Sequence, residues 1–276
     1  MVRTVAYRYK LLLYTIHYTL IMAKVIAVCG KGGVGKTTIS GLIVRLLKEK
    51  GLSPILAVDA DPSMNLNMTL GLDIGETVGN IREEAKPEKG KRPSSMSLTE
   101  YFELQVNLSL TEADSFDLLV MGRPEGKGCY CSANSNLREA LKKLTSAYKY
   151  VVIDNEAGME HISRQTDGSV DIMFIVSDST PKGLVAAMRT EELISRLENE
   201  VKKRFLIINR VSKEAPLNLP KEMQIPLAGY LRMDPILSEI ELAGKSIFEL
   251  PTNTPIYQDL QDILKGIDEK LNLFPL

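Results

Sequence analysis

The sequence predicts an α/β protein built on a single doubly wound, mainly parallel sheet with helices on both faces. Short apolar runs alternate with amphipathic segments along the chain, and this alternation is typical of βαβ units. A length of 276 residues suits one large domain, and a hydrophobic content of 44% is sufficient for its core. A glycine-rich loop follows the first apolar run at Gly30–Thr38, as expected for a phosphate-binding turn in such a fold.

The apolar runs are predicted to form the strands of this sheet. Runs of this length are typical of parallel strands that are buried on both faces. They are residues 25–29, 54–58, 116–121, 150–153, 172–176, 205–208 and 227–231. Helices are expected at residues 35–49, 134–147, 181–199, 235–242 and 255–271. The capping-box spacing Ser97-Leu98-Thr99-Glu100 predicts the start of another helix, and residues 83–92 are expected to form a solvated loop.

The first 21 residues do not fit the pattern of the domain that follows. They are basic and then apolar, like a signal peptide, but no small-residue cleavage site follows them. The apolar run of residues 11–22 is too short for an ordinary membrane span, and polar residues interrupt it. We expect the native chain to start at Met22, with residues 1–21 an extension and residues 22–276 the nucleotide-binding domain. An amphipathic membrane anchor is the alternative.

The balance of charges bears on the partners that the chain can recruit. Lys and Arg number 34 against 35 for Asp and Glu, so there is no global basic field to attract nucleic acid or membranes. Three cysteines are too few for a disulfide framework, which fits a reducing compartment. We therefore expect a cytoplasmic protein that binds neither nucleic acid nor membrane.

The loop Gly30–Thr38 matches the phosphate-binding pattern G-x-x-x-x-G-K-[ST] in full. Glycines let successive backbone N–H groups turn toward anionic oxygens, and the following helix adds its own free N–H groups. Lys36 is expected to reach the β- and γ-phosphates of ATP, and the Thr37 hydroxyl to bind Mg²⁺. The predicted nucleotide-binding residues of the loop are Gly32, Gly33, Val34, Gly35, Lys36, Thr37 and Thr38.

Three carboxylates and one amide follow apolar runs, at the sheet edge where ligands of open α/β sheets bind. Asp154 is expected to hold Mg²⁺ through water, with Asp59 as a second contact. Asp61 is expected to orient the attacking water; the alternative is that Asp59 and Asp61 cap a turn with Pro62. Asn209 is expected to pair with the adenine edge, unless it is an ordinary turn asparagine.

A second lysine, Lys31, lies inside the glycine loop. With it, the loop resembles the deviant Walker A motif, K-G-G-x-G-K-[ST], of the MinD/ParA/nitrogenase-iron-protein family. The resemblance implies a homodimer that closes face to face on nucleotide, with Lys31 crossing the interface to the partner's phosphates. The expected catalytic residues are then Lys31, Lys36 and Asp61. The alternative for Lys31 is simple solvation.

Two cysteines, Cys129 and Cys131, are separated by one residue. In an extended segment both side chains face the same side, but two thiolates supply only half of a tetrahedral sulfur site. Cys29 is expected to be a small core residue, and a lone His161 is more commonly hydrogen-bonded than a ligand. A two-fold dimer would place Cys129 and Cys131 of both subunits around one metal ion. The alternative is a pair of bystander cysteines.

The segment Gly122–Cys131 is similar to the signature segment of the CooC family, nickel-inserting ATPases for carbon monoxide dehydrogenase. Asp154–His161 resembles the second switch region of that family, and the similarity extends from Met22 to the C-terminus. It implies an ATP-dependent dimer that holds Ni²⁺ or Zn²⁺ on four thiolates. The expected function is an ATP-hydrolysing metallochaperone that supports nickel insertion into apo carbon monoxide dehydrogenase.

Two other functions stay open. The first is a positioning ATPase of the MinD/ParA type, which would use a basic membrane helix or a basic DNA-binding surface. Residues 257–273 of this chain are not basic. A redox protein like the nitrogenase iron protein would need widely separated cysteines in place of the C-x-C pair. Acetyl-CoA synthase is an alternative client, and residue types alone do not choose between nickel and zinc.

Overall fold

The computed structural model describes residues 23–85, 90–122, 131–156, 170–196, 201–212 and 219–271. Its strands form one eight-stranded sheet in the order β3-β4-β2-β5-β1-β6-β7-β8. All neighbouring strands are parallel except β3 and β4. The strands are β1 (Lys24–Gly30), β2 (Ile55–Ala60), β3 (Thr111–Glu112), β4 (Phe116–Val120), β5 (Tyr150–Asn155), β6 (Val170–Asp178), β7 (Val201–Val211) and β8 (Leu227–Arg232).

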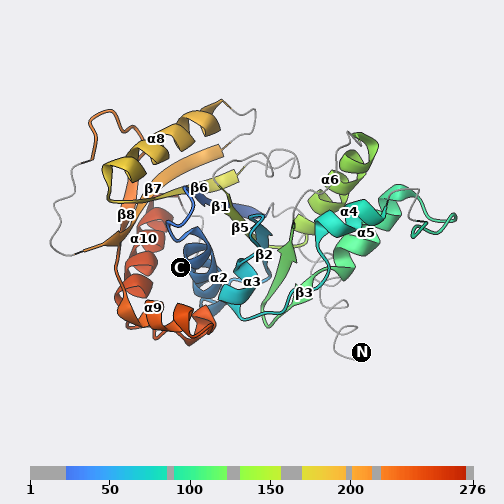
Figure 1. The fold of residues 1–276 in the computed structure, drawn as a ribbon, viewed down its shortest axis with the longest axis horizontal. Coiled ribbons are helices and arrows are strands. Elements are labelled where there is room, and N and C mark those ends of the chain that lie inside the picture. The colour runs from blue at the N-terminus through green and yellow to red at the C-terminus, as the bar shows by residue number, and fades with distance from the viewer. Residues whose placement is uncertain are drawn as a thin grey trace.

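Helices cover both faces of this sheet (Figure 1). One face carries α2 (Lys36–Glu49), α3 (Leu66–Leu70), α9 (Pro235–Leu242), the short 3-10 helix η2 (Ile247–Glu249) and α10 (Pro255–Leu271). The other carries α4 (Val78–Glu84), α5 (Leu98–Leu108), α6 (Cys131–Thr145) and α8 (Pro181–Ser195). None of the described helices is both long and apolar enough to cross a membrane.

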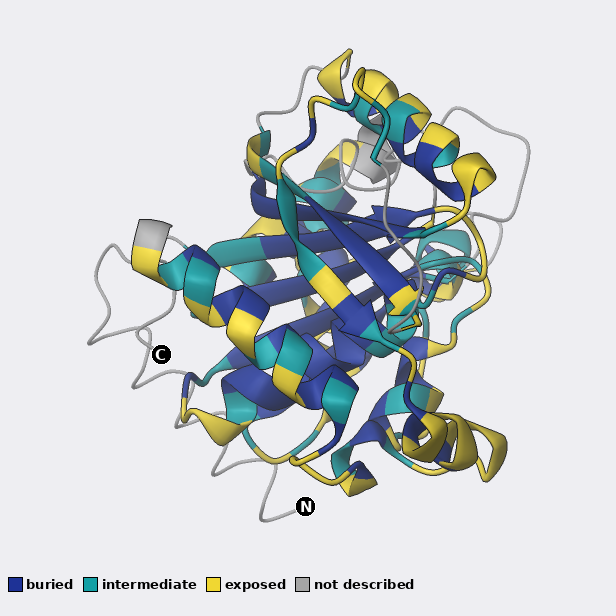
Figure 2. Ribbon diagram, turned by 90° about the vertical axis from the view of Figure 1, so that its left-hand side faces the viewer, coloured by how far each residue is buried: buried dark blue, intermediate teal, exposed yellow. Residues whose placement is uncertain are grey.

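The alternation of side chains along each strand divides the core into two layers. In β1, Val28 packs with the α2 and α10 layer, whereas Ala27 and Cys29 pack with the α6 and α8 layer. Figure 2 shows the buried sheet between helices whose outward faces are exposed. Because the central strands are buried on both faces, they read as continuous apolar runs in the sequence.

The strands and long helices predicted from the sequence are confirmed, with bounds that shift by a few residues. The predicted capping box is confirmed at the start of α5, where the Ser97 hydroxyl accepts from the Glu100 N–H and the Glu100 carboxylate accepts from the Ser97 N–H. The extension of residues 1–21 lies outside the described residues and stays a prediction.

Four short elements were not predicted: β3, α3, α4 and η2. The expected loop of residues 83–92 is wrong at its start, because α4 continues to Glu84. Its cap is Thr77, whose hydroxyl accepts from the Asn80 N–H, and its two buried residues, Val78 and Ile81, are three apart. So short a helix carries too few apolar positions for its period to stand out.

Candidate nucleotide-binding site

The glycine loop connects the C-terminal end of β1 to the start of α2, at the centre of the sheet. β5 and β6 flank β1 on its two sides, so the loop lies where the direction of chain winding reverses. Gly33 and Gly35 have φ values of 80° and 94°, a region that favours glycine. A Cβ on Gly35 would lie 2.4 Å from the Asn209 Nδ2, so the loop also needs a glycine there for space.

The first turn of α2 has free hydrogen-bond donors. Its N-cap is Gly35, no side chain caps it, and its first turn contains no acidic residue. The first N–H groups of a helix have no partner within the helix, and the helix dipole makes this end favourable for an anion. The loop and α2 therefore form a phosphate cradle whose charge is not already neutralised by the chain's own carboxylates.

The two lysines of the loop lie in different environments. Lys36 is buried, with its Nζ 4.0 Å from the Asp61 Oδ2, whereas Lys31 is exposed. Lys36 is thus held within the site that its own chain forms. The exposed Lys31 is available to a group outside the chain, which is the arrangement that an interface-crossing lysine requires.

The predicted magnesium residues lie together. Thr37 donates from its hydroxyl to the Asp154 Oδ2 at 2.6 Å, and Ser40 donates to the Asp154 Oδ1 at 3.3 Å. Burial raises the pKa of Asp154 to about 7 and that of Asp59 to about 6. Two buried carboxylates beside a hydroxyl fit Mg²⁺, which is commonly held by one or two carboxylates together with water and substrate phosphates.

Asp59 is also tied into the turn that follows β2. Its Oδ2 accepts from the Leu66 N–H at 2.9 Å, and its Oδ1 accepts from the Asp61 N–H at 3.2 Å. The turn-capping alternative therefore describes part of what Asp59 does. These bonds orient the carboxylate and hold Asp61 close to Lys36, so a turn role and a magnesium role are compatible.

Asn209 is hydrogen-bonded to the backbone of the phosphate loop. Its Nδ2 donates to the Val34 carbonyl at 2.8 Å, and its Oδ1 accepts from the Arg210 N–H at 2.9 Å. Arg210 donates from its guanidinium to the Gly33 carbonyl at 2.9 Å and has a positive φ of 59°. Because Asn209 and Arg210 hold these loop carbonyls, the N–H groups of the loop are left for phosphate oxygens. The pairing of Asn209 with adenine stays a prediction.

We expect Asn209→Ala to raise the Kd of ATP and GTP together by about tenfold, because one hydrogen bond to the loop is lost. Equilibrium binding of the two nucleotides to the full chain measures this effect. Asn253→Ala, which removes an exposed asparagine, is the matched control and should leave both Kd values unchanged. A loss confined to ATP would instead support the adenine role of Asn209.

Two residues of this site escaped the sequence-based prediction, Arg210 and Glu241. The Thr38 hydroxyl donates to the Glu241 Oε1 at 2.7 Å, which ties the start of α2 to α9. Thr38 and Glu241 are 203 positions apart, and only the return of the chain through β8 brings them together. Neither Arg210 nor Glu241 belongs to a sequence pattern that would have identified it.

The predicted thiolate site is not described. Cys129 lies outside the described residues, and Cys131 is described only as the first backbone position of α6. Within the described ranges, no group of three or more His, Cys, Asp or Glu residues is placed to hold a metal ion. Cys29 is buried, and burial raises the pKa of its thiol to about 12, as expected for a core residue. The metal site stays a prediction.

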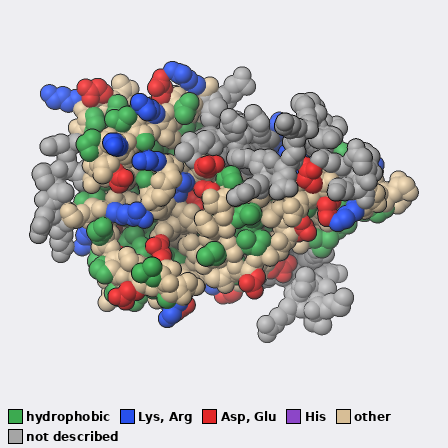
Figure 3. All heavy atoms as spheres, in the orientation of Figure 1, with side chains coloured by type: hydrophobic (Ala, Val, Ile, Leu, Met, Phe, Trp, Pro, Cys, Tyr) green, Lys and Arg blue, Asp and Glu red, His purple; other side chains and the backbone are tan. Residues whose placement is uncertain are grey.

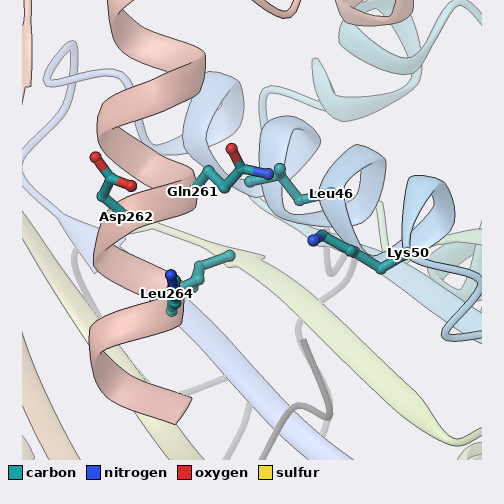
Figure 4. A pocket seen from close by; sticks show the side chains of 6 residues that line it. Leu46, Lys50, Gln261, Asp262 and Leu264 are labelled. Carbon is teal, nitrogen blue, oxygen red and sulfur yellow. The ribbon is translucent and has the colours of Figure 1, made fainter. Parts of the chain in front are cut away.

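A separate cavity of about 330 Å³ lies between α2 and α10 (Figure 4). Lys50, the C-cap of α2, and Gln261 of α10 point toward one another across it. None of the predicted site residues lines it. This cavity is thus distinct from the phosphate loop.

The loop, its two lysines and the paired carboxylates, placed at the switch point of a doubly wound sheet, define a P-loop NTPase. The chain belongs to the CobQ/CobB/MinD/ParA nucleotide-binding domain family, whose profile matches residues 25–247. This is a family of ATP-binding and ATP-hydrolysing proteins.

Several curated relatives match over most of their length. An uncharacterized ATP-binding protein of Methanocaldococcus jannaschii is 41% identical over 251 residues, which cover 89% of this chain and 99% of the relative. The carbon monoxide dehydrogenase accessory protein CooC of Rhodospirillum rubrum is 30% identical over 239 residues, which cover 82% and 89%.

Solved structures confirm the fold. The septum site-determining protein MinD of Pyrococcus horikoshii, complexed with Mg-ADP, is similar with a TM-score of 0.64 and 20% identity, covering 92% of this chain and 100% of that one. The MinD cell division protein of Aquifex aeolicus gives a TM-score of 0.65 at 22% identity, covering 90% and 98%. At such identities the similarity extends to the fold alone.

Proposed function

We propose that this protein is a dimeric, ATP-hydrolysing metallochaperone that carries Ni²⁺ or Zn²⁺ on Cys129 and Cys131 and supports nickel insertion into carbon monoxide dehydrogenase. ATP and Mg²⁺ bind at the phosphate loop. Lys36 and the N–H groups of α2 hold the phosphates, Asp61 orients the attacking water, and Lys31 reaches the partner's nucleotide. The metal ion is the cargo of this cycle.

One described contact carries the proposal. The Met121 N–H, directly after β4, donates to the Asp59 carbonyl at 2.8 Å. Gly122 follows directly and begins the segment that contains both cysteines. A movement of the turn around Asp59 on nucleotide binding would therefore act on the start of the cysteine segment. Such a connection is what a nucleotide-controlled metal site requires.

Two further observations support the proposal. The CooC protein of Rhodospirillum rubrum aligns with 82% of this chain, and its name links it to carbon monoxide dehydrogenase. Lys31 is exposed at the tip of the loop, where a second subunit could receive it. Acetyl-CoA synthase stays an alternative client for the same chemistry.

The test is anaerobic titration of the full chain with Ni²⁺ and with Zn²⁺, in the presence and absence of ATP. We expect about one metal ion per two chains in the wild type, held by four thiolates, and none at that affinity in Cys129→Ser/Cys131→Ser. Cys29→Ala is the matched control, because it removes the remaining cysteine without touching the site. A double variant that binds metal as tightly as the wild type would overturn the thiolate site.

A positioning ATPase of the MinD/ParA type is the second candidate, because the fold and the family accommodate both functions. The maintenance of carboxysome distribution protein A of Gloeothece citriformis is 27% identical over 60% of this chain. On the face drawn in Figure 3, Lys and Arg side chains lie among Asp and Glu side chains. ATP-dependent binding to DNA or to anionic vesicles at physiological salt would favour this second candidate over the metallochaperone.

A further inference from the structure

A cleft of about 660 Å³ lies between α5, α6 and the edge of the sheet formed by β3 and β4. This volume is in the range of sites that bind small molecules. Asp117, at the start of β4, lines the cleft, whereas the phosphate loop follows the C-terminal end of β1. Because β4, β2, β5 and β1 run parallel, the cleft lies toward the N-terminal ends of these strands and the nucleotide site at their C-terminal ends.

The cleft is acidic. Among the described residues that line it are four carboxylates, Glu100, Glu103, Glu112 and Asp117, and one cation, Lys143. Lys143 is already bonded to the Glu103 Oε2 at 2.7 Å, and Glu100 accepts from the N–H and hydroxyl of Ser97. The cleft therefore has an excess of negative charge, contributed by Glu100, Glu112 and Asp117.

Asp117 provides a second, independent observation. Its side chain is only 1% exposed, and its Oδ2 accepts from the Tyr148 hydroxyl at 2.6 Å. Its Oδ1 has no hydrogen-bond partner within the described chain, and the nearby Ala113 N–H donates to the Phe116 carbonyl instead. Burial raises the pKa of Asp117 to about 6. A buried carboxylate with one unpaired oxygen is costly unless a donor or a cation reaches it.

The walls of the cleft indicate what kind of cation fits. Leu104, Leu110, Ala140 and Leu144 line it beside the carboxylates. Glu112 is the cross-strand partner of Asp117, but no group of three or more His, Cys, Asp or Glu among the described residues is placed to hold a metal ion. Apolar walls next to carboxylates that form no metal site suit an ammonium group on a hydrocarbon stem, because the stem packs on the leucines while the charge meets a carboxylate.

We propose that this cleft binds a small linear amine, with its ammonium group at Asp117 and its alkyl chain against the leucines of α5 and α6. A second ammonium group on such a chain meets Glu112, the cross-strand partner of Asp117, so a diamine binds more tightly than a monoamine. The site acts separately from the nucleotide site and does not depend on the metal-carrying function.

Calorimetric titration of the full chain tests this site with n-butylammonium and 1,4-diammoniobutane chlorides, against n-butanol and sodium chloride at equal ionic strength. We expect saturable binding of one amine per chain, tighter for the diamine, and no binding of the alcohol. Asp117→Asn keeps an acceptor for Tyr148 and should weaken amine binding at least tenfold. Glu112→Gln, on the exposed edge strand, should weaken the diamine more than the monoamine.

The control is Glu249→Gln, which neutralises a carboxylate outside the cleft and should leave amine binding unchanged. Thermal unfolding of each variant confirms that it is folded before it is titrated. Binding of n-butanol as tightly as the amine, wild-type amine affinity in Asp117→Asn, or no amine binding beyond the salt control would each overturn the proposal.

Discussion

Replacing Lys31 by alanine should lower the kcat of ATP hydrolysis by about 10³-fold and change the Kd of ATP by no more than roughly threefold. Lys36 is buried within its own chain, whereas Lys31 is exposed and, in the proposed dimer, reaches the nucleotide of the partner subunit. A cation supplied across an interface contributes to the transition state and little to ground-state binding. Steady-state hydrolysis and equilibrium nucleotide binding measure the two effects separately.

A mixing experiment distinguishes a lysine that acts across the interface from one that acts within its own chain. Asp61→Asn should also be inactive, because Asp61 serves the nucleotide bound to its own chain. In a heterodimer of the two variants, the Lys31→Ala subunit keeps its own Asp61 and receives the partner's lysine. An equal mixture should then recover about a quarter of wild-type activity, since half of the dimers are mixed and each has one complete site.

The control for Lys31 is Lys50→Ala, which removes an exposed lysine at the other end of α2. Its kcat should equal that of the wild type. If mixtures of Lys31→Ala and Asp61→Asn stay inactive while each variant still binds ATP, Lys31 does not act across an interface. A Lys31→Ala variant with wild-type kcat would mean that this lysine is simply solvated.

Most of the sheet could be predicted because its central strands are buried on both faces. Such strands are continuous apolar runs, and a loop of known geometry follows the first of them. The loop fixes where β1 ends and α2 begins, which in turn places Asp59 and Asp154 at the same sheet edge. In the structure, Asp59 of β2 and Asp154 of β5 are directly paired neighbours in the sheet.

The parts that could not be predicted depend on contacts between distant segments. Asn209 was selected for its place after an apolar run, but its bond to the Val34 carbonyl, 175 positions away, is a product of the β1-β6-β7 order. The bond between Thr38 and Glu241 has the same origin. Asp117 lies inside the predicted strand of residues 116–121, and its bond from the Tyr148 hydroxyl depends on how residues 31 positions apart pack.

Gly30→Ala should lower the free energy of unfolding by about 3 kcal/mol, the largest stability loss that we expect from adding one methyl group to the loop. A Cβ on Gly30 would lie 2.3 Å from the Val176 carbonyl oxygen, in the neighbouring strand β6. Gly30 also has a φ of 145°, which strains any residue with a Cβ. Because Val176 is a backbone neighbour in the middle of the sheet, it cannot move aside as a flexible side chain could.

Gly32→Ala separates this packing effect from a general intolerance of the loop. No heavy atom lies within 4 Å of a Cβ on Gly32, and its φ is not in the left-handed region. Urea unfolding without nucleotide should therefore give Gly32→Ala a stability within about 0.5 kcal/mol of the wild type. Equal stabilities for the two variants would contradict the clash. The expected difference would show that the loop is anchored to the sheet through Gly30, so that bound phosphate meets a rigid cradle.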